Sequence, residues 1–424
     1  MEKAMNESQP PVPQPSALYR WSVLFFISMA MFGNYYVFDS ISPLADMLKS
    51  QLNFSDSDIG LLNAIYSFPN IIMVLIGGMI IDRIGARKAS LLFAMLCLAG
   101  SVVTALKGNV TVMAAGRLIF GLGAESLIVA ITTVIARWFK GKELSLAFGL
   151  NLTLSRLGTF AALNSPTVAK SLYTEWQYPL LLSIGAALIS VVSVVVYFAM
   201  ESHAEKHFQL GEREEVDKVR VADIFKLNPS FWYVSFLCVT FYSAIFPFQT
   251  FAVKFFQEYH GLTREAAGFT SSIITFASMV CTPLFGLLID KIGKRASLMM
   301  IGSVMLVPVY LLLVYTALHP LIPMVIMGLS FSLIPAAMWP SVALIVKEAR
   351  LGTAYGVMTM IQNVGLFGFN LLIGWANDFS GGYALGMWLF SILGFAGMMF
   401  AWLLKRSDAQ HNDSRLEVMT MAHE

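Results

Sequence analysis

Charged residues are scarce in this chain. Asp, Glu, Lys and Arg together make up only 13% of the 424 residues, whereas about 25% is usual in soluble domains. Hydrophobic residues account for 57%, and the mean hydropathy is +0.69. A soluble fold cannot hide so much apolar surface from water, so we predict that lipid surrounds most of the chain. The net charge of +2 gives no reason to expect nucleic acid as a partner.

Cysteine is scarce as well, and no catalytic or metal-binding pattern takes its place. Cys97, Cys238 and Cys281 all lie in apolar runs, so we expect them to pack in the interior rather than form disulfides or bind a metal. The pair Gly121-x-Gly123 also lies in an apolar run, which favours close helix packing over a nucleotide-binding loop. We therefore predict that the protein is not an enzyme and uses no cofactor or metal.

Long runs without charge are abundant, and a membrane-spanning helix needs about 20 apolar residues. The run 296–346 is long enough for two helices, which His319-Pro320 would separate. Two more helices are expected at 110–136 and 144–169, where isolated charges interrupt the pattern. The remaining runs are 22–38, 59–81, 89–106, 176–200, 231–253, 266–289, 351–377 and 379–404. The sequence predicts an all-α membrane protein with about twelve transmembrane helices in two six-helix halves.

One long charged segment, Glu201 to Lys226, separates the two halves. We interpret it as a solvated linker that is partly helical. The predicted organisation is a flexible tail, a first bundle, a cytoplasmic linker, a second bundle and a C-terminal tail, at residues 1–17, 18–200, 201–226, 227–406 and 407–424.

A ten-residue motif occurs once in each half. Residues 78–87 and 286–295 both read Gly-x-x-x-Asp-[Arg/Lys]-x-Gly-x-Arg, and each copy lies between two apolar runs. Two membrane halves with the same loop at the same place are typical of transporters. We predict that these loops anchor to lipid headgroups and form a latch that breaks when the transporter opens to the cytoplasm. The latch residues are Asp82, Arg83, Arg87, Asp290, Lys291 and Arg295. The alternative is that these charges only set the membrane topology.

Lysine and arginine are unequally distributed between the two sides of the membrane. Both repeated loops and both ends of the helical region are rich in them, whereas the opposite loops hold only Lys49, Lys107, Lys170 and Arg264. Cytoplasmic loops carry the excess of Lys and Arg. We therefore expect both termini, the linker and the repeated loops to face the cytoplasm.

Five ionisable residues fall at membrane depth, where each costs roughly 2.5–3.5 kcal/mol on insertion scales. At about 1.5 Å rise per residue, Glu125 and Arg156 lie closest to the midplane, on sequential antiparallel helices. We predict that both face a cavity between the halves and bind the charged ends of a substrate. The alternative is a structural ion pair between the two helices.

The other three ionisable residues are expected nearer the outer surface. Arg117 could pair with Asp39 as a gate or as a tie between helices, and Lys254 closes its apolar run. Proline follows an aromatic segment in Tyr66-Ser67-Phe68-Pro69-Asn70 and in Trp339-Pro340, and proline frees a backbone carbonyl inside a helix. Further candidates for the substrate cavity are Asp39, Tyr66, Lys254, Trp339 and Asn363.

The repeated motif, the twelve helices and the central linker resemble the major facilitator superfamily over roughly 18–406. Arg117-x-x-x-Gly121-x-Gly123 is also similar to the fourth-helix motif of that superfamily. The Gly-x-x-x-Gly-Pro motif that drug antiporters carry in the fifth helix is missing from the segment around Arg156, which argues against a drug exporter.

Longer segments resemble one branch, the lysosomal dipeptide transporters called major facilitator superfamily domain-containing protein type one. The matching segments are 66–70, 123–127, 138–144, 328–333, 339–340 and 351–356. This branch is known for uniport of dipeptides and for an accessory glycoprotein. The resemblance implies a membrane-depth acid at Glu125 and a base at Arg156. No acidic dileucine signal occurs in residues 1–20 or 407–424. We therefore expect a bacterial cytoplasmic-membrane relative, with the lysosomal membrane as the alternative.

The sequence thus predicts a monomeric carrier of small zwitterionic solutes, most of all dipeptides, that works by alternating access. Glu125 would bind the ammonium group and Arg156 the carboxylate. An acid that stays beside a base keeps its charge, which favours facilitated diffusion; if Arg156 moves away, Glu125 could carry a proton. The alternatives are a proton-coupled symporter for monocarboxylates or sugar acids and, in a different class, a non-transporting receptor or scaffold.

Overall fold

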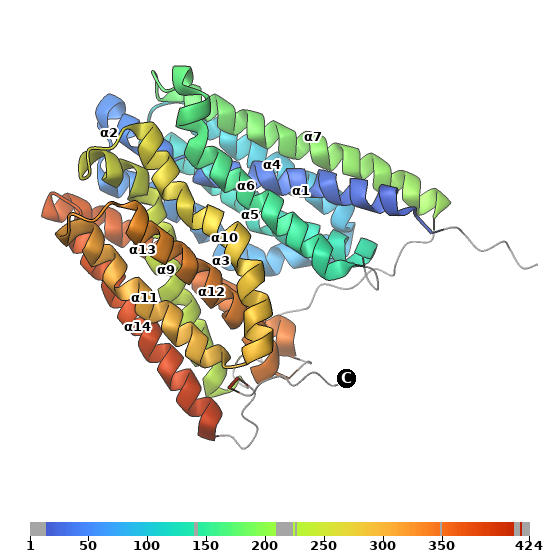
Figure 1. Ribbon diagram of the computed structural model, residues 1–424. Coiled ribbons are helices and arrows are strands. Elements are labelled where there is room, and N and C mark those ends of the chain that lie inside the picture. Colours follow the sequence, from blue (N-terminus) through green and yellow to red (C-terminus); the bar gives the residue numbers. More distant parts are fainter. Residues whose placement is uncertain are drawn as a thin grey trace, which may run out of the picture.

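The computed structural model describes residues 14–139, 143–208, 224, 227–347, 350–410 and 416–417, and every regular element among them is a helix (Figure 1). The first half comprises α1 (Ala17–Asp39), η1 (Ser42–Leu44), α2 (Ala45–Leu52), α3 (Asp56–Ile84), α4 (Ala86–Leu106), α5 (Val110–Phe139), α6 (Leu144–Val168), η2 (Lys170–Leu172) and α7 (Gln177–His207). The second half comprises α9 (Pro229–Glu258), α10 (Arg264–Ile292), α11 (Arg295–Tyr315), α12 (Leu321–Ile345), α13 (Leu351–Ser380) and α14 (Ala384–Gln410).

The helix count agrees with the expected all-α membrane fold. Eleven helices in the described part of the chain are long and apolar enough to cross a membrane. The two segments of α3, Asp56–Val74 and Ile76–Ile84, meet at a bend of 55°, and the number rises to twelve when they are counted as one span. The sequence marks several of the helix ends. Ser55 and Asp58 form a capping box at the start of α3, and Asn228 caps α9 ahead of Pro229.

The second glycine of the repeated motif has a positive φ in both halves. Its second glycine, Gly85 or Gly293, ends α3 or α10 with φ of 82° and 74° respectively. Residues with a Cβ rarely adopt such angles, so the motif needs glycine at this position. The next helix then starts at once, α4 at Ala86 and α11 at Arg295.

In the described part of the chain, the two halves are joined at one end, which we call the closed side. Figure 1 shows the first half, in blue and green, and the second half, in yellow to red, meeting at this end and spreading apart at the other. Across the halves α3 packs on α13 and α6 on α10. Gly60 faces the Asn370 carbonyl, and Gly374 faces the Asp56 carbonyl, so the absence of a Cβ lets α3 and α13 approach closely.

Ion pairs and hydrogen bonds join the halves at the closed side. Asp378 at the end of α13 accepts hydrogen bonds from the backbone nitrogens of Asp56 (2.9 Å) and Ser57 (2.7 Å), at the first turn of α3, and from Ser57 Oγ (2.5 Å). Four ion pairs also cross between the halves here: Arg264–Asp46, Lys170–Glu265, Lys49–Glu258 and Lys254–Asp56.

The opposite end, which holds the repeated loops, we call the open side. Here each ion pair between described residues joins partners of the same half. The pairs in the first half are Arg20–Glu143, Arg87–Glu205, Arg137–Glu201 and Arg137–Glu205, and those in the second are Arg295–Asp290 and Lys405–Glu417. The structure therefore shows the conformation in which the halves are closed at one side and separated at the other.

The predicted linker starts later than expected, because α7 continues to His207. Glu201 is only 1% exposed and accepts hydrogen bonds from Arg137 and from Trp138 Nε1 (2.6 Å). Burial with these partners makes Glu201 part of the first bundle rather than of a solvated segment. The charged linker residues between 209 and 223, like tail residues 1–13, lie outside the described part of the chain.

Part of the predicted C-terminal tail is docked on the second half. Leu416 is buried, and its carbonyl accepts a hydrogen bond from Arg295 N at 2.6 Å. The Glu417 carboxylate accepts from Ser297 N and Ser297 Oγ, both at 2.8 Å. Ser297 lies in the first turn of α11, so Glu417 supplies a carboxylate to backbone donors that have no partner within the helix. The other residues after 410 lie outside the described part.

We predict that Glu417→Ala lowers the free energy of unfolding by about 1 kcal/mol, because it removes this cap from α11. The measurement is thermal unfolding of the purified protein in detergent. Glu175→Ala, in an exposed turn of the first half, serves as the control. Equal melting temperatures for Glu417→Ala and the control would contradict the cap.

We also predict that Asp378→Ala loosens the closed side by about 1.5–3 kcal/mol, because α3 loses its charged acceptor in the other half. Spin labels at Ser50 in the first half and Leu318 in the second should then show an added population at longer distance. Glu175→Ala, at an exposed position of the first half, should leave that distribution unchanged. A distribution that Asp378→Ala does not alter would show that this carboxylate does not hold the halves together.

Candidate functional site

A cavity of about 250 Å³ lies between the two halves. Its walls are mainly aromatic and polar, and the charged residues among them are Glu125 and Arg156. The first half contributes Asn34, Tyr35, Phe38, Tyr66, Glu125, Ile128 and Arg156, and the second half contributes Tyr242, Phe246, Trp339, Thr359, Gln362 and Leu366. The structure therefore brings together four of the predicted site residues: Glu125, Arg156, Tyr66 and Trp339.

Glu125 lies at the middle of α5, as its sequence position indicated. Gly121 faces the Tyr66 carbonyl of α3, and Gly123 faces the Phe93 carbonyl of α4, so the two glycines seat α5 closely against both neighbours. This is the packing role expected for the pair. The Tyr66 hydroxyl donates a hydrogen bond to Glu125 Oε1 at 3.4 Å. The carboxylate thus has one long hydrogen bond and faces the cavity.

Arg156 lies at the middle of α6 and faces the same cavity. Its guanidinium lies over the Tyr35 ring at 5.5 Å and over the Phe331 ring at 5.2 Å. These rings come from different halves, and their faces attract the cation. Neither Arg156 nor Glu125 forms an ion pair with a described residue. The structural ion pair between them, the alternative reading of the sequence, is not formed in this conformation, and the basis for expecting facilitated diffusion is absent with it.

Arg117 does not pair with Asp39, although both are buried near the closed side. Its guanidinium donates to the carbonyls of Leu62 (3.1 Å), Val37 (3.0 Å) and Phe38 (3.1 Å), and to Asn63 Oδ1 (3.0 Å). Backbone carbonyls take the place of the expected carboxylate. Arg117 therefore ties α5 to α1 and α3, within one half.

Three predicted cavity residues lie elsewhere. Lys254 is fully buried at the closed side, where Asp56 from the other half and Glu258 neutralise it. Asn363 is 1% exposed and donates to the Thr359 carbonyl in its own helix. Asp39 ends α1 and is buried outside the cavity lining. Lys254 thus belongs to the contact that closes the halves, not to the cavity walls.

Three of the predicted latch residues, Arg87, Asp290 and Arg295, pair with described residues, and these partners lie in the same half. Arg87 donates to Glu205 (2.7 Å) and Ser202 (3.0 Å) of its own half, and Arg295 donates to Asp290 at 2.8 Å. The other three, Asp82, Arg83 and Lys291, are exposed at the open side. A latch that joins the halves would belong to the opposite conformation.

Sequence reasoning missed Asn34, Phe38, Ile128, Tyr242, Thr359 and Leu366 as parts of the cavity wall. Most of them lie in helices that are apolar all round, so hydrophobic periodicity does not single out an inner face. Tyr242 shows the difficulty, because α9 is buried along most of its length. The usable signal was polarity at membrane depth, which favoured Tyr66 and also misled at Asn363.

Comparison with known proteins agrees with this architecture. The Major Facilitator Superfamily profile matches residues 24–369 and 236–418. The lysosomal dipeptide transporter MFSD1 of Bos taurus is 32% identical over 97% of this chain and 92% of its own length. The Mus musculus protein of the same name is 35% identical over 88% of this chain and 83% of its own length.

A solved structure supports the fold. The crystal structure of a bacterial homologue of the human lysosomal transporter Spinster, inward-facing and unoccupied, aligns with a TM-score of 0.75 at 15% identity. The alignment covers 93% of this chain and 98% of that one. The family profile, the relatives and the two-bundle fold around a central cavity agree. The chain belongs to the Major Facilitator Superfamily and is a multi-pass membrane transporter of small molecules, not an enzyme.

Proposed function

We propose that this transporter carries dipeptides across the membrane by alternating access, and that it binds them between Glu125 and Arg156. One observation carries the proposal. These two opposite charges line a single cavity at membrane depth, and neither has an ion-pair partner among the described residues. Charges at this depth require compensation, and a ligand with an ammonium group and a carboxylate compensates both.

The chemistry of the wall favours a zwitterion over a simple anion. A monocarboxylate would pair with Arg156 and leave Glu125 without a counter-charge, whereas a dipeptide offers both ends. Charge-assisted hydrogen bonds from guanidinium to carboxylate, and from ammonium to carboxylate, are about twice as strong as neutral ones. The remaining wall is largely aromatic, which suits apolar side chains of the substrate.

The relatives support the same substrate class, since both of those described above are named lysosomal dipeptide transporters.

We place the termini in the cytoplasm, because the open side carries the repeated basic loops. The cavity of this conformation then opens to the cytoplasm. We further place the protein in a bacterial cytoplasmic membrane, with the lysosomal membrane as the alternative, and we expect it to act as a monomer.

Alternating access requires that the two sides close in turn. The carboxylate of Asp378 and the four crossing ion pairs hold the closed side. In the opposite conformation we propose that the repeated loops, with Asp82, Arg83, Arg87, Asp290, Lys291 and Arg295, join the halves at the open side. The ion pairs that Arg87 and Arg295 now make within their own halves would then exchange for contacts across the halves.

One prediction from the proposed function concerns the class of ligand that binds. Dipeptides such as dialanine should raise the melting temperature of the purified protein, because a ligand that binds only the folded state stabilises it by about 2.7 kcal/mol at 100 times its Kd. Free alanine, lactate and glucuronate should shift it little. Stabilisation by lactate or glucuronate without dialanine would replace the proposal with an anion symporter.

Another prediction tests separately how the ammonium end and the carboxylate end of the substrate are bound. Glu125→Gln should weaken binding of dialanine by about tenfold or more, because the ammonium loses its counter-charge. The same change should not affect N-acetyl-dialanine, which has no ammonium. Arg156→Ala should weaken dialanine in the same way and should spare dialanine amide. Glu175→Gln and Arg406→Ala, at exposed positions, are the matched controls.

Uptake of dialanine into proteoliposomes, measured with the same variants, links binding to transport. Glu125→Gln and Arg156→Ala should each abolish uptake, and the two controls should retain it. If both cavity variants bind and transport dialanine like the unmodified protein, the assignment of these two residues is wrong.

A further inference from the structure

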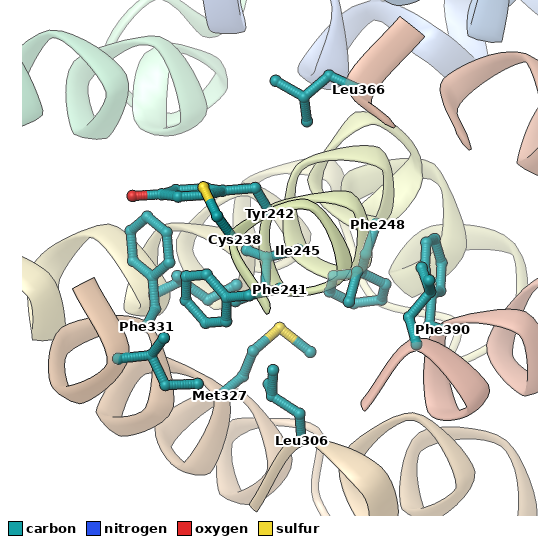
Figure 2. Packing of buried hydrophobic residues seen from close by; sticks show 14 of the residues in the cluster. Cys238, Phe241, Tyr242, Ile245, Phe248, Leu306, Met327, Phe331, Leu366 and Phe390 are labelled. Carbon is teal, nitrogen blue, oxygen red and sulfur yellow. The ribbon is translucent and has the colours of Figure 1, made fainter. Parts of the chain in front are cut away.

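Tyr242 of α9 makes a hydrogen bond that is required neither for the binding of charged groups by Glu125 and Arg156 nor for the packing of the bundle. Its hydroxyl accepts a hydrogen bond from Trp339 Nε1 at 3.0 Å. Its ring stacks on Phe246 at 5.6 Å and meets the edge of Phe241 at 5.0 Å, so its position is well fixed. Figure 2 shows the hydroxyl extending past Cys238, away from the apolar cluster around Phe248 and Phe390.

The direction of the tyrosine proton follows from the chemistry of the two groups. The indole nitrogen can only donate, whereas a tyrosine hydroxyl can accept and can also donate its one proton. Because Trp339 occupies an acceptor position of the hydroxyl, the proton of Tyr242 must point elsewhere. No described residue accepts it. Tyr242 lines the cavity, so the proton is available to a molecule bound there.

Two other donors lie on the same part of the wall. The side-chain oxygen of Gln362 faces Cys238 Sγ at 3.6 Å, which leaves its amide NH₂ free to face the cavity. Arg156 lies over the Phe331 ring, and that ring meets the edge of Phe246, on which Tyr242 stacks. Arg156, Tyr242 and Gln362 therefore share one aromatic wall, and each offers donors to the cavity.

We propose that Tyr242 binds the carboxylate of the substrate together with Arg156, and that Trp339 orients the tyrosine hydroxyl for this contact. The proposal rests on the proposed dipeptide function and adds to it the orientation in which the substrate lies in the cavity. The ammonium end contacts Glu125, where Tyr66 belongs to the same half. The carboxylate end is held by Arg156 of the first half and Tyr242 of the second. The carboxylate is thus the end of the substrate that joins the halves.

The test compares two ligands that differ at one group, dialanine and dialanine amide, by calorimetric titration of the full-length protein in detergent. Tyr242→Phe should weaken dialanine about tenfold, because a hydrogen bond to a charged group is lost, and should change the affinity for dialanine amide less than threefold. Tyr259→Phe is the matched control. It removes a hydroxyl at the end of α9 that donates to the Val314 carbonyl at 2.7 Å and does not line the cavity.

A second variant tests the orienting role. Trp339→Phe should weaken dialanine when Tyr242 is present and should have no further effect in the Tyr242→Phe background. Melting temperatures of the unliganded variants report whether each one folds. Additive losses from the two changes, or equal losses for dialanine and its amide, would overturn the proposal.

The outcomes separate this inference from the proposed function. If the unmodified protein binds dialanine and Tyr242→Phe binds it equally well, the inference fails and the dipeptide function stands. If the protein binds lactate and not dialanine, the dipeptide function fails, and the same Tyr242→Phe comparison with lactate still decides whether Tyr242 anchors a carboxylate. If it binds no carboxylate ligand, both are wrong.

Discussion

The structure depends on the cost of placing charge inside a membrane. Arg117, Lys254, Glu125 and Arg156 all lie at depths where an uncompensated charge is unfavourable, and the fold compensates them in two ways. Arg117 and Lys254 are buried and fully partnered, by three backbone carbonyls and Asn63 in one case and by two carboxylates in the other. Glu125 and Arg156 lack such partners among the described residues, and both face the cavity between the halves. Arg117 and Lys254 therefore have a structural role, whereas the charges of Glu125 and Arg156 remain available to a ligand.

The contacts at the closed side also differ from those at the open side. At the closed side, small residues let α3 and α13 approach, and Asp378 places a carboxylate at the start of α3, where the helix dipole favours negative charge. Three of the ion pairs that cross here are partly exposed, so each of them contributes little, whereas the Lys254–Asp56 pair is buried. The open side keeps its ion pairs within the halves. The closed side also has apolar contacts, because first-half residues such as Ile41, Leu44 and Leu48 belong to the same buried cluster as the helices of the second half. Opening this side therefore requires that apolar surfaces separate as well as that polar contacts are exchanged.

Sequence reasoning recovered the features that depend on length and depth. A fixed helical rise placed Glu125 and Arg156 near the middle of their helices, and the repeated motif located the short loop between α3 and α4 and the one between α10 and α11. It failed where the partner comes from a distant part of the chain or from the backbone. The residues around Lys254 in the sequence do not show that Asp56 of the other half lies beside it. Likewise, no side-chain pattern shows that Arg117 donates to backbone carbonyl oxygens. Tyr242 was hidden because α9 is apolar on every face, and the docking of Leu416 and Glu417 was missed because two residues carry no periodicity.

Both charged residues of the cavity belong to the first half, while the lining contributed by the second half carries no charge. Under the proposed function, the first half therefore supplies both charges that bind the ends of a peptide, and the second half supplies uncharged residues that would contact its side chains. Substitutions at Phe246, Thr359 or Leu366 can alter which side chains are accepted without disturbing the charges that define the substrate class. If the protein carries peptides as proposed, its preference among side chains can therefore change during evolution while the two charges that bind the ends of the peptide are kept.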